Sequence, residues 1–132
     1  MARGGLVTET REPEGRRRRL LAVTDAGRDA LAGWLTTRAT EPTRIHDDAL
    51  LRLYFARPGP GDPTVLTLAA DQERAHQERL ALYDGLVASG RLPEGSPQRA
   101  TLELGRRFEE AAVRFWAEVP AAVGAALPGE PA

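Results

Sequence analysis

The chain of 132 residues contains no cysteine and no lysine, and it has only two histidines. Without cysteine, disulfide scaffolds, thiolate metal sites and cysteine nucleophiles are excluded. The chain also lacks a Gly-x-Ser-x-Gly nucleophile motif and a glycine-rich phosphate-binding loop that follows a strand. We therefore expect no enzyme activity, no catalytic residue and no cofactor.

Long apolar runs are missing as well. No run approaches the roughly 20 residues that cross a bilayer, and the N-terminus lacks the apolar segment of a signal peptide. These absences predict a cytoplasmic protein without a membrane partner. His46 and His76 have no metal-ligand spacing, so we expect both to be exposed or cap-related polar residues and no metal site. We expect Glu109 and Glu110 on a solvated helix face.

Positive charge is concentrated at one end of the chain. Residues 1–23 hold six arginines against three glutamates, which leaves +3, whereas the remainder holds twelve arginines against sixteen acids, which leaves −4. The formal net charge of −1 hides this asymmetry. A basic end on an acidic body indicates that an anionic partner meets that end only.

The basic end has the pattern of a β-hairpin. Residues 5–10, GLVTET, suit a short strand, residues 11–17 contain Pro and Gly and predict a loop, and residues 18–23 can return as a second strand. The run Arg16–Arg19 then lies at the hairpin tip. The alternative is a solvated charged loop without a partner. Because strand side chains alternate between faces, the four arginines cannot all contact one surface equally.

We interpret this cationic tip as a contact surface for double-stranded DNA, since guanidinium groups bind phosphates and release counterions. The candidate DNA-binding residues are Arg11, Arg16, Arg17, Arg18 and Arg19.

Four helices are predicted after the hairpin, over residues 25–38, 45–56, 63–89 and 97–119, with residues 57–62 as a hinge and residues 120–132 frayed. Thr24 suits an N-cap and Gly27 a packing position. Leu31, Trp34 and Leu35 share one face of the first helix. We place a domain boundary between residues 1–40 and 41–132.

The two long helices carry apolar seams. Within residues 63–89, Leu66, Ala69, Leu80, Tyr83 and Val87 follow a seven-residue spacing that predicts packing along another helix. These helices leave more apolar surface than so short a chain readily buries, which favours a homodimer.

In this order, the stretches GLVTETREPEGRRRRLLAVTDAGRDALAGWL, IHDDALLRLYFA, AADQERAHQERLALYDGL and TLELGRRFEEAAVRFWAEV resemble the PadR family of bacterial transcriptional regulators. The resemblance implies a mainly α fold, in which a partial winged helix with a β-hairpin wing precedes an α-helical dimerisation domain with long helices. Family members carry about three helices ahead of the wing, including the recognition helix, and here Met1 stands four residues before Gly5.

The resemblance also implies a dimer interface. Its candidate residues are Leu80, Tyr83, Val87, Phe108, Phe115 and Trp116. Tyr54 and Phe55 are candidates for a pocket that binds a small-molecule effector, although simple packing is the favoured interpretation for both. Two alternatives stay open: a dimerisation or interaction module that lacks DNA-binding activity of its own, and a MarR-like winged-helix regulator.

Overall fold

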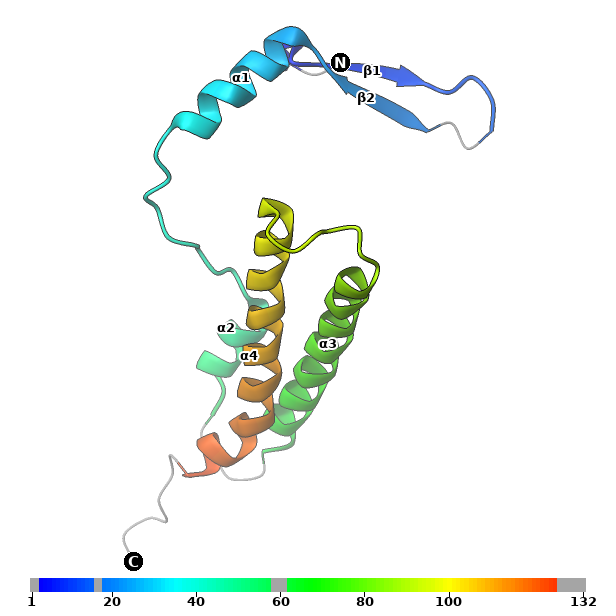
Figure 1. The fold of residues 1–132 in the computed structure, drawn as a ribbon. Coiled ribbons are helices and arrows are strands. Elements are labelled where there is room, and N and C mark those ends of the chain that lie inside the picture. Colours follow the sequence, from blue (N-terminus) through cyan, green and yellow to red (C-terminus); the bar gives the residue numbers. More distant parts are fainter. Residues whose placement is uncertain (1–2, 16–17, 58–61, 126–132) are drawn as a thin grey trace, which may run out of the picture. The chain divides into compact units, whose positions relative to one another are not determined.

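A computed structural model describes residues 3–15, 18–57 and 62–125 (Figure 1). They form two compact units, Met1–Arg44 (unit 1) and Ile45–Ala132 (unit 2), which we describe separately. The elements in chain order are η1 (Arg3–Gly5), β1 (Val7–Arg11), β2 (Arg19–Val23), α1 (Asp25–Thr36), α2 (Asp48–Tyr54), α3 (Pro63–Ala88) and α4 (Pro97–Ala125). The predicted fold class, a mainly α chain with a β-hairpin wing and long helices, is confirmed.

Unit 1 begins with the hairpin. β1 and β2 pair antiparallel, from Val7 opposite Val23 to Arg11 opposite Arg19. A backbone hydrogen bond from the Glu12 N–H to the Arg18 carbonyl, at 3.1 Å, continues the pairing beyond the strands. In the loop, Gly15 has a φ of 80°, which glycine adopts without a steric penalty. Residues 16 and 17 at the tip lie outside the described residues.

Thr24 joins α1 to the hairpin. Its hydroxyl accepts a hydrogen bond from the Gly27 N–H at 3.0 Å and donates one to the Gly5 carbonyl at 2.7 Å. Gly27 packs so closely against the residue that precedes β1 that an added Cβ would lie 2.1 Å from the Leu6 carbonyl oxygen. The predicted cap and packing position are therefore confirmed, and together they fix the angle at which α1 leaves the hairpin.

The apolar face of α1 is uncovered. Leu31, Trp34 and Leu35 are all exposed, and Trp34 keeps 69% of its surface in contact with solvent. The shared apolar face of Leu31, Trp34 and Leu35 is typical of a buried helix face, but no described element of unit 1 packs over it. Gly27 alone is buried among the residues that the structure describes in unit 1.

Unit 2 is a hairpin of two long helices with α2 packed on it (Figure 1). Asp47 caps α2 by accepting hydrogen bonds from the Ala49 and Leu50 N–H groups, so α2 begins at Asp48 and not at the predicted Ile45. Asp62 caps α3, with Pro63 in the first turn as predicted.

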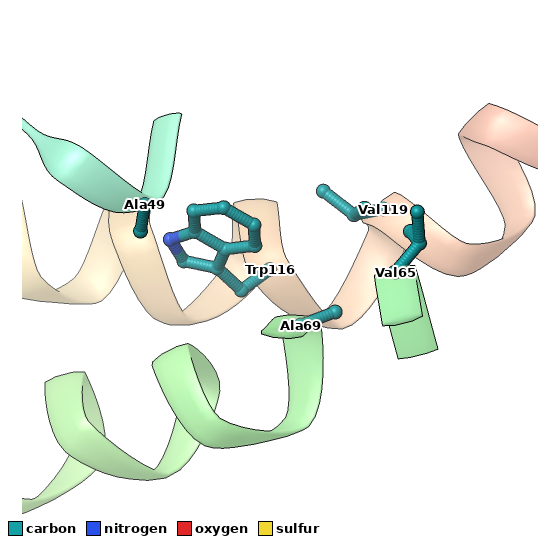
Figure 2. Packing of buried hydrophobic residues seen from close by; sticks show 5 residues of the cluster. All are labelled: Ala49, Val65, Ala69, Trp116 and Val119. Carbon is teal, nitrogen blue, oxygen red and sulfur yellow. The ribbon is translucent and has the colours of Figure 1, made fainter. Parts of the chain in front are cut away.

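The core of unit 2 lies where the three helices meet. Figure 2 shows the Trp116 indole of α4 extending toward Ala49 of α2, with Ala69 of α3 nearby and Val65 beside Val119. Trp116 is only 2% exposed. Burying a side chain of this size supplies a large share of the apolar stabilisation in so small a core.

The C-terminal helix is longer than predicted. The prediction ended it at Val119, because residues 120–132 are rich in Pro, Gly and Ala. α4 nevertheless continues through Pro120 to Ala125. Val119 is buried and Val123 packs against the same core, so contacts on both sides of Pro120 hold the last turn in place.

Candidate nucleic-acid interface

Two described arginines of the hairpin, Arg11 and Arg19, lie around one carboxylate. Arg11 and Arg19 are directly opposite each other in the ladder, and Glu9 is on the same face two residues before Arg11. The Arg19 Nε lies 2.6 Å from Glu9 Oε1, and the Arg11 Nε lies 4.0 Å from the same oxygen. The hydrogen bond from Arg19 lowers the pKa of Glu9 below its ordinary value. Glu9 therefore stays ionised and holds the two guanidinium groups together.

Arg18 differs from these two. It is exposed and forms no ion pair with any residue that the structure describes. Arg11 and Arg19 also remain largely exposed, so their remaining N–H donors are open to a ligand. Arg16 and Arg17 fall outside the described residues. Three of the five predicted DNA-binding side chains thus lie on an exposed hairpin, and the sequence of residues 7–23 carries five arginines against three glutamates, an excess that favours an anion.

The candidate dimer residues separate into three groups by burial. Phe108 and Phe115 are 46% and 43% exposed on α4. Trp116 instead lies in the core of its own chain. Leu80, Tyr83 and Val87 are half-buried.

Tyr83 packs on α4 of the same chain, because an added Cβ at Gly105 would lie 3.0 Å from its ring. The seven-residue seam of α3 that contains Tyr83 therefore faces α4, as Arg106 Nε bonded to Asp84 at 2.9 Å also indicates. The predicted packing along another helix is confirmed, and that helix is α4 of the same chain.

A buried polar pair joins the same two helices. His76 Nδ1 of α3 pairs with Glu109 Oε2 of α4, and the Glu109 side chain is only 3% exposed. Our expectations of a solvated Glu109 and an exposed or cap-related His76 are therefore wrong. The position of His76 on the α3 seam was the available signal, because a polar group there must find a partner when the seam is buried.

Unit 2 also has small cavities around α2. His46 and His76 line one of about 380 Å³ together with Asp47 and Asp48. No group of three or more His, Asp or Glu side chains suited to a metal ion occurs among the described residues.

A more apolar cavity of about 710 Å³ lies between the end of α2 and the start of α3, with Phe55, Val65 and Leu68 in its wall. Tyr54 stacks edge-to-face on Phe55, with ring centroids 5.1 Å apart, and both rings are exposed. Simple packing therefore does not account for these two aromatic residues.

Within the described ranges, no helix is both long enough and apolar enough to cross a membrane.

Comparison with known proteins agrees with this geometry. The family model "Virulence activator alpha C-term" matches residues 45–123. No curated protein sequence matches the chain significantly.

Among solved structures, smu.1604c from Streptococcus mutans is 20% identical with a TM-score of 0.73, and the match covers 89% of this chain and 70% of that one. Bacillus subtilis PadR in complex with operator DNA is 20% identical with a TM-score of 0.63, covering 90% and 70%. The same PadR has been solved with p-coumaric acid.

The Vibrio cholerae virulence activator AphA is 24% identical with a TM-score of 0.60, covering 92% of this chain and 70% of AphA. At these identities the likeness to solved structures establishes a common fold. The family model, in contrast, spans more than half of the chain. The chain therefore belongs to the PadR-like family, whose C-terminal domain that model describes.

Proposed function

We propose that this protein is a DNA-binding transcriptional regulator that uses the β1–β2 hairpin as a wing on the phosphate backbone. The observation that carries the proposal is the exposed arginine group at the end of the hairpin, on a chain whose remainder is acidic. Arg11, Arg18 and Arg19 supply phosphate contacts there, and Arg16 and Arg17 extend the same basic sequence. The complex of Bacillus subtilis PadR with operator DNA supports this use of the fold. Binding to bacterial DNA places the protein in the cytoplasm.

Unit 2 holds the regulator as a homodimer in this proposal. Phe108 and Phe115 are the predicted interface residues that remain exposed and form the contact. Leu80, Tyr83, Val87 and Trp116 contribute by fixing α3 against α4, so that the exposed surface of α4 is rigid. Two linked wings bind two half-sites at a raised effective concentration, which increases affinity without new contacts.

A small-molecule effector fits the cavity between α2 and α3. Its wall is mainly apolar, with Arg52 and Asp71 as polar groups at the edge. Such a cavity suits a small aromatic ligand that carries a polar group. The p-coumaric acid complex of PadR supports an effector-controlled, non-enzymatic role for this fold.

The second candidate is an interaction module that dimerises without binding DNA itself. It is favoured by the family match to residues 45–123, which contain none of the hairpin. The same match favours a PadR-like regulator over the MarR-like alternative.

A salt titration of duplex binding separates the two candidates. The test variant replaces Arg11 and the Arg16–Arg19 run with alanine. The control variant replaces five arginines of unit 2, namely Arg57, Arg74, Arg79, Arg91 and Arg99. The slope of log K against log salt is negative, and each lost phosphate contact reduces its steepness by about 0.9.

We expect the hairpin variant to reduce the steepness of this slope, and the unit 2 variant to reduce it by a smaller amount. Equal slopes in the wild type and the hairpin variant would reject the wing and favour the interaction module. Circular dichroism of both variants checks that the helices are intact.

A further inference from the structure

Two cavities of unit 2 are neighbours at the junction of α2 and α3. We call the one of about 710 Å³ the apolar cavity and the one of about 380 Å³ the polar cavity, and both have Arg52 and Leu68 in their walls. Along α3 these walls extend from Pro63 to His76, a length of roughly 20 Å. An elongated ligand can therefore occupy both cavities at once.

The apolar cavity suits an aromatic ring. Phe55, Val65 and Leu68 are in its wall. Phe55 is 75% exposed, and its edge-to-face contact with Tyr54 limits the orientation of its ring. A ring presented in this way offers a stacking or edge contact to another aromatic ring.

The charges around both cavities leave an excess of negative charge. Arg52 is the single arginine among the described residues of the two walls, and its Nε lies 2.8 Å from Asp48 Oδ2. Asp71 has a partner of its own, because Arg74 Nη2 lies 2.9 Å from its Oδ1. Asp47, in contrast, forms no ion pair within the described ranges. The polar cavity therefore keeps one carboxylate that no arginine neutralises.

Only one oxygen of the Asp47 carboxylate is used by α2. Its Oδ1 accepts hydrogen bonds from the Ala49 and Leu50 N–H groups at 2.9 and 3.2 Å. Its Oδ2 accepts none from any residue in the described part of the chain. The second oxygen is therefore open to a donor in the polar cavity, on a side chain that the first oxygen holds in place.

His76 contributes a second acceptor. Its Nδ1 pairs with Glu109 of α4, whose side chain is only 3% exposed. When Nδ1 donates its proton to the carboxylate, Nε2 is a basic acceptor. Nε2 forms no hydrogen bond with a described residue, yet no buried side-chain nitrogen in the described ranges lacks a partner. Nε2 is therefore accessible, and the polar cavity is the space that His76 borders.

These acceptors select the charge of the ligand. An ammonium group has three N–H donors and no acceptor. Asp47 Oδ2, His76 Nε2 and the amide oxygen of Gln72, which is in the same wall, match these donors in number. A ligand carboxylate would instead meet the Asp47 carboxylate and would compete with Asp48 for Arg52. Charge complementarity therefore favours a cation.

We propose that these two cavities bind an aromatic amine, with its ring against Phe55 and its ammonium group between Asp47 and His76. Glu109 is a positioning residue, because it acts through His76 and does not touch the ligand. The inference rests on the effector of the proposed function and names the chemical class of that ligand. Since α2 and α3 contact the same molecule, binding stabilises the packing of α2.

Three probes of similar shape test the charge preference. Tyramine, tyrosol and 3-(4-hydroxyphenyl)propionate share a 4-hydroxyphenyl ring on a short chain, which ends in an ammonium, a hydroxyl and a carboxylate group, respectively. Each probe is titrated into the full chain while the backbone amide signals of α2 and α3 are followed by NMR. We expect tyramine to bind at least about tenfold more tightly than tyrosol, and the propionate to bind most weakly.

Two variants remove the negative charges one at a time. Asp47→Asn keeps the helix cap, because Asn and Asp cap helices equally well, and Glu109→Gln keeps an oxygen that accepts from His76 Nδ1. We expect Asp47→Asn to weaken tyramine binding about tenfold and Glu109→Gln to weaken it by a smaller factor. Tyrosol binding stays unchanged in both variants, whereas a merely structural role would alter it as well.

Asp29→Asn is the matched control, since Asp29 is exposed on α1 and forms no ion pair in the described ranges. We expect it to bind all three probes like the wild type.

Three results would overturn the inference. Equal affinities of tyramine and tyrosol, or tighter binding of the propionate, would reject the amine class while the effector site stands. An amine preference that survives Asp47→Asn would show that the ammonium group lies elsewhere. Unmoved α2 and α3 signals with all three probes at about 10 mM would remove the site itself. The wing is tested separately by its salt slope.

Discussion

Unit 1 and unit 2 are stabilised in different ways. Unit 2 buries Trp116, Val65 and Val119 in a shared core, whereas the described part of unit 1 buries only Gly27. Unit 1 is held by the hairpin ladder and the Thr24 cap, with its aromatic side chain Trp34 in solvent. Unit 2 is thus a helical unit with a core of its own, whereas the order of the basic hairpin in unit 1 depends on hydrogen bonds.

The largest expected effect comes from the two tryptophans, which have opposite environments. Trp116→Ala removes the centre of the unit 2 core and is expected to destabilise it by about 3–5 kcal/mol. Trp34→Ala removes an exposed ring and is expected to cost under about 0.5 kcal/mol. Urea denaturation followed by circular dichroism at 222 nm measures both. Similar losses for the two variants would contradict the contrast between the units.

A smaller effect is expected at the junction of hairpin and helix. Gly27→Ala places a methyl group against the Leu6 carbonyl, so α1 must shift away from Leu6, at a cost of about 1–3 kcal/mol. Hydrogen exchange should speed up at Thr24 and along the hairpin, and remain unchanged in α3 and α4.

Gly33→Ala is the matched control, because an added Cβ there meets no atom within 4 Å. In mid-helix this change is expected to stabilise α1 by about 0.5–1 kcal/mol. Loss of hairpin protection in Gly33→Ala would mean that the Gly27 effect is not specific to its contact with Leu6.

The smallest expected effect is the titration of Glu9. The hydrogen bond from Arg19 lowers the pKa of Glu9 in the folded hairpin relative to the unfolded chain. The stabilisation is therefore present above the ordinary value of 4.5 and is lost as the pH falls through the lower folded value. Amide exchange in β1 and β2 between pH 6 and 3 should show this loss.

The Glu9→Gln variant is the control for this titration, because it removes the titrating carboxylate and keeps the shape of the side chain. Hairpin exchange in this variant should depend less on pH in the same window. Because the variant also frees Arg11 and Arg19, we expect it to bind duplex DNA slightly more tightly than the wild type. Weaker binding would show that Glu9 positions these arginines for the contact.

Much of the fold follows from local sequence signals. Thr24, Asp47 and Asp62 each accept hydrogen bonds from the N–H groups of the first turn of a helix. Such caps depend on neighbouring residues only, so Thr24 and the Asp62–Pro63 start were predictable. The hairpin was also predictable, because its strand and loop signals depend on neighbouring residues.

Contacts between distant residues were less predictable. The extension of α4 past Pro120 depends on core contacts of Val119 and Val123. The pairing of His76 with Glu109 requires knowing which helix α3 packs against. How Arg19 shares its N–H donors between Glu9 and a DNA phosphate could not be predicted from the sequence, because the strand register determines whether Arg19 lies beside Glu9.

The most direct test of the account follows backbone amide signals by NMR while a DNA duplex is added. The account predicts that the largest shifts occur at Arg11, Arg18, Arg19 and the loop between the strands, with α3 unchanged, and that they fade as salt is raised. Shifts confined to α2, α3 and α4, with the hairpin signals unmoved, would contradict it.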